Sequence, residues 1–193
     1  MDKNLSCSEI TKRKMAGALK ELIRTEPFEK ITVSDITEKC GVHRQTFYYH
    51  FQDRYELLDW ILYQELFVPL VDGFNFDNMY EKLFRLFSAM YEDKRFYQHA
   101  LKINNDDIIR FIGSVVTDEF LRIIRTLGEE SGVASVDEDE ELFVSEFFGY
   151  GISGVVFNWV SKGMKETPEV MIKRMECLVN TCKTVIITRN SNQ

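Results

Sequence analysis

The sequence is poor in the residue types that interrupt helices. Only 3 prolines and 10 glycines occur among 193 residues, which excludes collagen-like, low-complexity and linker-dominated proteins. The 4 cysteines form no C-x-x-C pair, so they indicate neither a zinc ribbon nor a disulfide framework and suit a reducing compartment. The apolar content of 45 % is sufficient for a packed core. We therefore expect a globular protein built from long helices.

Long hydrophobic runs are also missing. The longest stretch without a charged residue, 147–161, has 15 residues, whereas a membrane-spanning helix needs about 20 mostly apolar residues. The N-terminal segment lacks the apolar centre of a secretory signal peptide. The sequence therefore predicts a cytoplasmic protein without membrane partners.

Groups typical of catalysis and metal binding are scarce. The three histidines, His43, His50 and His99, have no acidic residue at metal-ligand spacing, and no serine or cysteine nucleophile motif occurs. Residues 149–154 spell G-x-G-x-x-G, but they lie in an apolar helical run, whereas the nucleotide-binding motif follows a strand. We expect no metal, cofactor or enzymatic activity, and we assign these small residues to close helix packing or to space for a ligand.

Charge is unevenly distributed along the chain. Residues 1–54 contain 10 Lys and Arg against 8 Asp and Glu, whereas residues 55–193 contain 14 against 23, which together give the net charge of −7. The net negative charge of the whole protein disfavours binding to nucleic acid. Any DNA-binding surface must therefore lie in the N-terminal part, with the acidic remainder turned away from phosphate.

Hydrophobic periodicity predicts helices along the whole chain. Apolar residues at positions 15, 18, 19, 22 and 23 mark one face of a first helix, which should end near Pro27. Longer helices are expected in the C-terminal part, over 76–92, 94–103, 106–128, 138–163 and 168–190.

A short helix-turn-helix unit follows the first helix. Thr32 and Asp35 form a capping box, and Gly41 supplies the left-handed turn that ends this second helix. Residues 44–51 form the next helix, and Asp53 caps a fourth. The predicted fold class is all-α, with about nine helices. A three-helix DNA-binding domain over 1–54 precedes a helical effector-binding and dimerisation domain over 55–193.

This N-terminal unit resembles the DNA-binding region of TetR-family transcription factors. The resemblance covers residues 6–62, and the remainder agrees with the family in helix count and length. It rests on the ordered series Ile31, Val33, Ile36, Gly41, Val42, Thr46, Tyr48, Phe51 and Leu57. The resemblance implies a homodimeric, effector-responsive transcriptional regulator, by default a repressor.

The first turn of the expected recognition helix carries three side chains that can read base edges. Arg44 can pair bidentately with guanine and Gln45 with adenine, while Thr46 can contact a thymine methyl group or a phosphate. Tyr48 and Tyr49 diverge by about 100°, so at least one faces outward, and Tyr49 can reach a base edge or a phosphate. A solvated helix start is the simpler alternative. The polar turn argues against a small-molecule-binding protein that has lost DNA recognition.

Phosphate contacts are expected on both sides of this turn. The resemblance implies them for Tyr48, Thr32 and Arg54, where helix N-terminal amides and a full charge favour an anion. His50 can donate to the DNA backbone, although a packing role explains it equally well. Gln45 stands where the family often has a small residue, so the preferred DNA sequence does not follow from the resemblance.

The apolar run 147–160 predicts a dimer. Because this helix is apolar around most of its circumference, more than one of its sides must be covered, and a single subunit offers one covering face. Pairing of helices 138–163 and 168–190 with their copies would form a four-helix interface, as the resemblance also implies. Two recognition helices would then read half-sites about 34 to 36 Å apart, or a multiple of that, in a near-palindromic operator on double-stranded DNA.

Aromatic residues in the C-terminal part are candidates for an effector pocket. We expect Tyr91, Phe111 and Phe157 to line it, although core packing explains most aromatic residues there. Residues 43–51 followed by 57–61 are similar to the family's activators of dihydroxyacetone-kinase operons. In that subgroup a kinase-like protein partner delivers the signal. The signal is therefore either an unknown small-molecule effector or such a partner.

Overall fold

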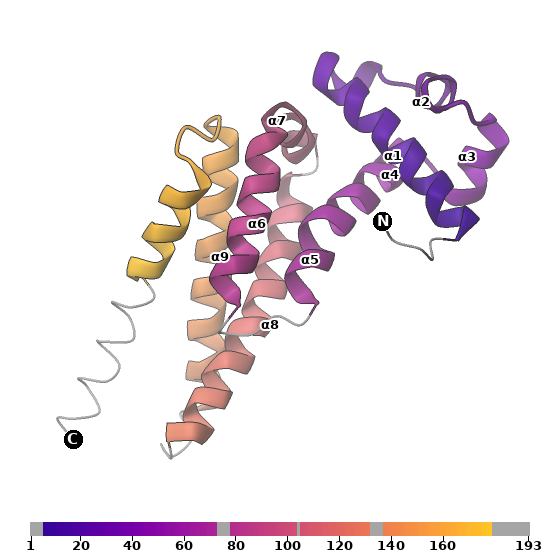
Figure 1. The fold of residues 1–193 in the computed structure, drawn as a ribbon. Helices are drawn as coiled ribbons and strands as arrows, with labels where there is room; N and C mark the ends of the chain where they lie inside the picture. The colour runs from indigo at the N-terminus through magenta and orange to yellow at the C-terminus, as the bar shows by residue number, and fades with distance from the viewer. Residues whose placement is uncertain (1–5, 73–77, 104, 132–136, 179–193) are drawn as a thin grey trace.

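The computed structural model describes residues 6–72, 78–103, 105–131 and 137–178, and within these ranges it consists of helices and turns without strands. An N-terminal head is joined to a longer C-terminal body in which α6, α8 and α9 run side by side (Figure 1). None of the described helices combines the length and the apolar character needed to cross a bilayer. The predicted all-α fold class is confirmed.

The head contains three α-helices and one turn of 3-10 helix. These are α1 Cys7–Thr25, η1 Phe28–Lys30, α2 Val33–Cys40 and α3 Arg44–His50. The predicted capping box is present, because the Asp35 amide donates to the Thr32 hydroxyl at 3.2 Å and the Thr32 amide donates to the Asp35 carboxylate at 2.7 Å. Gly41 ends α2 in the left-handed conformation, with a φ of 68°. These caps place the helix-turn-helix where the sequence predicted it.

An apolar core fixes the three head helices against one another. Leu19 of α1, Ile36 of α2 and Phe47 of α3 are fully buried, and Phe51 after α3 is nearly so. Phe47 within α3 and Phe51 at its C-terminal cap lie with ring centroids 6.0 Å apart, and both anchor α3 in this core. The opposite side of α3 is thereby held toward solvent.

A continuous helical segment connects the head to the body. It consists of α4 Arg54–Leu62, a π-helical turn η2 Tyr63–Phe67 and α5 Val68–Val71. Pro69 has no N–H to donate to the Glu65 carbonyl, and its ring would crowd that carbonyl in a regular α-helix. The wider turn, closed by the Val68 N–H on the Tyr63 carbonyl, lies directly before Pro69. The segment therefore enters the body without a break in the helix (Figure 1).

Among the described residues, four further α-helices and a C-terminal helical segment form the body. They are α6 Met79–Glu92, α7 Lys94–Ile103, α8 Asn105–Ser131, α9 Glu138–Ser161 and the helical residues 168–178. The predicted ranges agree with the first four to within 3 residues at each end. The last helix begins at Pro168, as expected, and the rest of its predicted range lies outside the described residues.

Helices α8 and α9 approach closely through small residues. Ser145, Gly149 and Ser153 of α9 are buried and repeat every four residues along the side that faces α8. A β-carbon at position 149 would lie 2.8 Å from the Gly113 carbonyl oxygen and 2.9 Å from the Thr117 backbone nitrogen. The glycine-rich tract therefore lies inside a helix, unlike a nucleotide-binding loop, and Gly149 is the glycine of the tract that permits the close approach.

Candidate DNA-binding surface

The first turn of α3 presents polar side chains on the outside of the head. Arg44 and Gln45 are exposed, and Thr46 is half-buried. The Arg44 Nη2 atom lies 3.3 Å from the Tyr48 hydroxyl oxygen, and the guanidinium carbon lies 5.8 Å from the Tyr48 ring centroid. Arg44 and Tyr48 therefore form one exposed polar pair across a helical turn. Major-groove readout requires exposed side chains of this kind at the start of a short helix.

Both tyrosines of α3 face solvent. Tyr49 is 83 % exposed and Tyr48 is 51 % exposed, whereas Phe47 is buried. His50 is half-buried, and its ring centroid lies 4.9 Å from that of Tyr49. Packing within the head does not account for Tyr49, because most of its surface is in water. Its position suits a contact with DNA.

Thr32 begins α2, and the capping box occupies its side chain. Its hydroxyl group donates to the Asp35 carboxylate at 2.7 Å. This hydrogen bond and the one from the Thr32 amide lower the pKa of Asp35, so the carboxylate is charged at neutral pH. A phosphate at the start of α2 would meet this negative charge. The phosphate contact of Thr32 stays a prediction, and it would have to compete with this capping interaction.

Arg54 has partners different from those expected. Its Nη1 atom donates to the carbonyl oxygens of Phe28 at 2.8 Å and Glu29 at 3.1 Å, and also to that of Ile31. Its guanidinium carbon lies 4.8 Å from the Phe28 ring centroid and 5.3 Å from that of Tyr55. In this arrangement Nη1 is directed at the backbone of the head, and the expected phosphate contact of Arg54 stays a prediction. Arg54 ties the loop before α2 to the start of α4.

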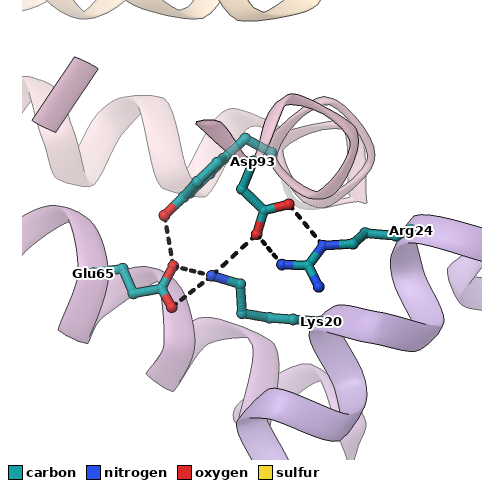
Figure 2. A network of polar contacts seen from close by, with 5 residues as sticks. Lys20, Arg24, Glu65 and Asp93 are labelled. Carbon is teal, nitrogen blue, oxygen red and sulfur yellow. Dashed lines mark hydrogen bonds and ion pairs between the residues drawn. The ribbon is translucent and has the colours of Figure 1, made fainter. Parts of the chain in front are cut away.

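A cluster of five side chains, here called the junction network, joins the head to the body. Its members are Lys20 and Arg24 of α1, Glu65 of η2, Asp93 between α6 and α7, and Tyr97 of α7 (Figure 2). The Lys20 Nζ atom lies 2.7 Å from both Glu65 carboxylate oxygens and 3.3 Å from Asp93. Arg24 donates to both Asp93 oxygens, at 2.7 and 2.5 Å, and the Tyr97 hydroxyl donates to Glu65 at 2.5 Å. Two cations thus balance two anions across the junction.

The surroundings of the junction network favour its charged form. Burial raises the pKa of Asp93, but Arg24 and Lys20 together outweigh burial and hold this pKa below its ordinary value. The hydrogen bond to Asp93 raises the pKa of Arg24. Burial and the neighbouring Glu65 raise the pKa of Tyr97, so its hydroxyl remains a donor. Sequence analysis missed this network, and its one local signal is the one-turn spacing of Lys20 and Arg24.

The three expected effector-pocket residues do not line one common pocket. Phe157 borders an apolar cavity of about 40 Å³ between α5, α6, α8 and α9. Tyr91 instead stacks on Trp159, with ring centroids 6.4 Å apart, and is not part of that lining. The side chain of Phe111 lies outside the described residues. The assignment of Tyr91 to an effector pocket stays a prediction, and the cavity beside Phe157 holds a few water molecules at most.

Two family descriptions match the chain. Residues 17–61 match bacterial regulatory proteins of the tetR family, and residues 77–181 match a transcriptional regulator C-terminal region. The HTH-type dhaKLM operon transcriptional activator DhaS of Lactococcus lactis subsp. lactis (strain IL1403) is 32 % identical over 103 residues. The aligned part covers 53 % of this chain and 55 % of that protein, so it spans about half the length of the curated relative.

Solved structures share the fold over most of the chain. A dihydroxyacetone kinase operon activator DhaS has a TM-score of 0.74 at 22 % identity, covering 91 % of this chain and 97 % of its own. NalD, the secondary repressor of the MexAB-OprM multidrug efflux pump in Pseudomonas aeruginosa, has a TM-score of 0.59 at 17 % identity, covering 88 % and 93 %. Because the C-terminal match alone extends over more than half of the sequence and the head forms a helix-turn-helix, this chain belongs to the TetR family of bacterial transcriptional regulators.

Proposed function

We propose that the protein is a homodimeric, effector-responsive repressor that binds a near-palindromic operator through α3. The observation that carries this proposal is the exposed polar first turn of α3 above a buried Phe47 anchor. Tyr48 and His50 contact phosphates beside the groove. The base contacts come from Arg44, Gln45, Thr46 and Tyr49.

The distribution of small and large apolar side chains around α9 supports dimerisation. Its side toward α8 carries small residues such as Ser145 and Ser153, whereas Phe143 and Phe147 are 65 % and 68 % exposed. Val155 extends this exposed apolar stripe toward the C-terminal end of the helix. Large apolar side chains gathered on a solvent-facing surface indicate contact with another molecule. A two-fold arrangement with a second copy covers the stripe of both protomers at once.

Footprinting on the DNA upstream of the protein's own gene tests this proposal. We expect two protected half-sites whose centres lie about 34 to 36 Å apart along the duplex, or a multiple of that distance. A single protected half-site, or no protection by the folded protein anywhere in that region, would contradict it.

We also propose that the protein acts in the cytoplasm and has no catalytic role. The support is its membership in a family of transcriptional regulators, whose target is the bacterial chromosome.

The size of the internal cavities favours a second candidate, an activator of a dihydroxyacetone-kinase-type operon that receives its signal from a kinase-like protein. Two cavities beside α6 and α8 measure about 40 and 30 Å³, and both have apolar linings. Sites for drug-sized ligands measure roughly 300 to 1,000 Å³. A metabolite between α6 and α8 would have to displace closely packed side chains, whereas a protein partner, or a ligand in the open groove of about 530 Å³ between α9 and residues 168–178, would act from outside.

Transcript levels distinguish the two candidates. Deletion of the gene should raise transcription of operator-linked genes if the protein is a repressor and lower it if the protein is an activator. Transcription from the operator with purified protein can then be repeated with the dialysable and the retained fractions of a cell extract. A response to the dialysable fraction alone would contradict the protein-partner candidate.

A further inference from the structure

The corner between α6 and α7 contacts both the head and the end of α9. Asp93 and Lys94 are adjacent in the chain but bind opposite partners. The Asp93 carboxylate accepts from Arg24 and pairs with Lys20 in the head. The Lys94 ammonium group donates to the Met164 carbonyl at 3.1 Å, in the turn that follows α9. Two successive residues therefore connect the head to the turn that follows α9.

On the head side, the contacts are shared and largely removed from water. The Lys20 and Asp93 side chains are 17 % and 16 % exposed, and each binds two members of the junction network (Figure 2). Removing the partner of a charge in such a place destabilises the folded protein strongly, because water does not fully replace the lost partner. The head therefore cannot turn relative to the corner without breaking several polar contacts together.

On the body side, the turn after α9 is held from two directions. Met164 is fully buried and has a φ of 48°, which is uncommon for a residue other than glycine. The Lys94 ammonium group that binds its carbonyl also lies 3.4 Å from the Tyr91 ring centroid. Trp159 stacks on Tyr91, and its indole N–H donates to the Glu166 carbonyl at 3.0 Å. A shift of this turn would therefore displace the corner.

The same turn borders the surface that the second protomer is proposed to cover. An open groove of about 530 Å³ lies between α9 and residues 168–178. Lys162, Lys165 and Glu166 of the turn line it, together with Val155 of the exposed stripe. The packing of this surface and the position of the turn are therefore linked.

We propose that the α6–α7 corner is the joint through which packing at the α9 surface fixes the angle of each DNA-binding head. This inference rests on the proposed function as a dimeric regulator. A rearrangement around residues 168–178 moves the Met164 turn, Lys94 carries the movement to the corner, and the junction network carries it to α1. A signal that acts on this joint changes the spacing of the two heads and hence operator occupancy.

Binding of the full-length protein to a complete operator and to a single half-site tests the joint. Glu65→Gln and Asp93→Asn remove charges of the junction network, and Glu81→Gln, an exposed α6 carboxylate paired with Arg85, is the matched control. Only the complete operator requires fixed head spacing. We expect both network variants to bind it about five-fold or more weakly, while their half-site affinity and the control stay unchanged. Unchanged operator affinity, or equal losses on both DNAs, would overturn the proposal.

A double variant tests whether both sides of the corner act as one joint. Lys94→Met removes the donor to Met164 but keeps most of the apolar stem, and it should weaken operator binding as Asp93→Asn does. Because the two links act in series, breaking both should cost no more than breaking one. The double variant Asp93→Asn with Lys94→Met should therefore bind the operator as tightly as the single variant with the lower affinity. If the fold-losses of operator affinity of the two single variants multiply in the double variant, the two effects are independent and the joint is refuted.

A measurement without DNA separates this inference from the proposed function. Spin labels on the exposed Cys7 of α1 report the distance between the heads of a dimer, once the other cysteines are replaced by serine. We expect a narrow distance distribution that broadens in Glu65→Gln and in Lys94→Met. An unchanged distance distribution in the variants would disprove the joint even if operator binding is intact. Because the measurement uses no DNA, it stays valid if the wild type fails to bind an operator.

Discussion

Arg54 carries its charge close to the DNA-binding surface but uses it within the head, on the carbonyl groups of Phe28, Glu29 and Ile31. A lysine ammonium group can donate to several carbonyl groups, but it lacks the planar guanidinium that lies near the Phe28 and Tyr55 rings. We therefore expect Arg54→Lys, like Arg54→Ala, to lower the free energy of unfolding by about 1 to 3 kcal/mol in denaturant titrations. The control is Arg13→Ala, which removes an exposed arginine paired with Glu9 and should change stability little.

The salt dependence of DNA binding separates the two roles of Arg54. A residue that positions α2 lowers affinity without changing the slope of log affinity against log salt. A phosphate contact would reduce the magnitude of the slope by about 0.9, and lysine would restore it. A reduced slope in Arg54→Ala together with rescue by Arg54→Lys would contradict the positioning role.

Asp93 makes stability depend on acid pH. Its folded-state pKa lies below the ordinary value of 3.8, because Arg24 and Lys20 outweigh the effect of burial. The carboxylate therefore contributes stability above its unfolded-state pKa and loses that contribution as the pH falls through the folded-state pKa. Urea titrations should show Asp93→Asn less stable than wild type at neutral pH, with the difference shrinking below about pH 4. A difference that stays constant with pH would contradict the ion pairs.

At the scale of elements, the contact between α8 and α9 depends on Gly149. An alanine methyl group there would press on the Gly113 carbonyl and the Thr117 backbone nitrogen, which cannot move without shifting a helix. We expect Gly149→Ala to lower the free energy of unfolding by about 1 to 3 kcal/mol. Gly17→Ala is the control, because open space surrounds Gly17 on α1 and the change should stabilise by about 0.5 to 1 kcal/mol. Equal effects of the two substitutions would contradict the close approach.

The ends of elements could be predicted from the sequence because the groups that mark them are local. Thr32 caps the N-terminus of α2, Gly41 caps its C-terminus and Asp53 caps the N-terminus of α4, each through contacts within a few residues. Likewise, helical periodicity alone predicts that at least one of Tyr48 and Tyr49 faces outward, and both are exposed. These features include the candidate base-contacting turn.

Features that join distant elements could not be predicted in this way. Glu65 meets Lys20 across 45 residues of sequence and Tyr97 across 32, and nothing near any of these positions specifies the partner. Arg54 finds its carbonyl acceptors 23 to 26 residues earlier. The size of the cavity beside Phe157 depends on how several helices pack together. In each case the outcome depends on tertiary packing rather than on local pattern.

At the scale of the whole molecule, the exposed stripe of α9 should control assembly. Phe147, at 68 % exposure, lies within that stripe. Phe147→Asp would place a charge in the dimer contact, so we expect sedimentation to show a folded monomer at micromolar concentration. Phe84→Asp, at a partly exposed position of α6, is the control and should remain dimeric. A dimeric Phe147→Asp, or a monomeric wild type, would contradict the proposed interface.

The charge distribution fits the proposed orientation on DNA. The acidic residues 138–141 lie at the start of α9, at the end of the body away from the head (Figure 1). Repulsion between this end and phosphate favours an approach in which the heads lead.

The most direct test of DNA reading by α3 compares the affinities of wild type and Arg44→Ala for the footprinted operator and for a scrambled duplex of equal length. We expect Arg44→Ala to weaken operator binding by about 1 to 3 kcal/mol and to relax preference at one base pair, with a much smaller loss on the scrambled duplex. If Arg44→Ala and Gln45→Ala both bind the operator as tightly as the wild type does, base reading by α3 is contradicted.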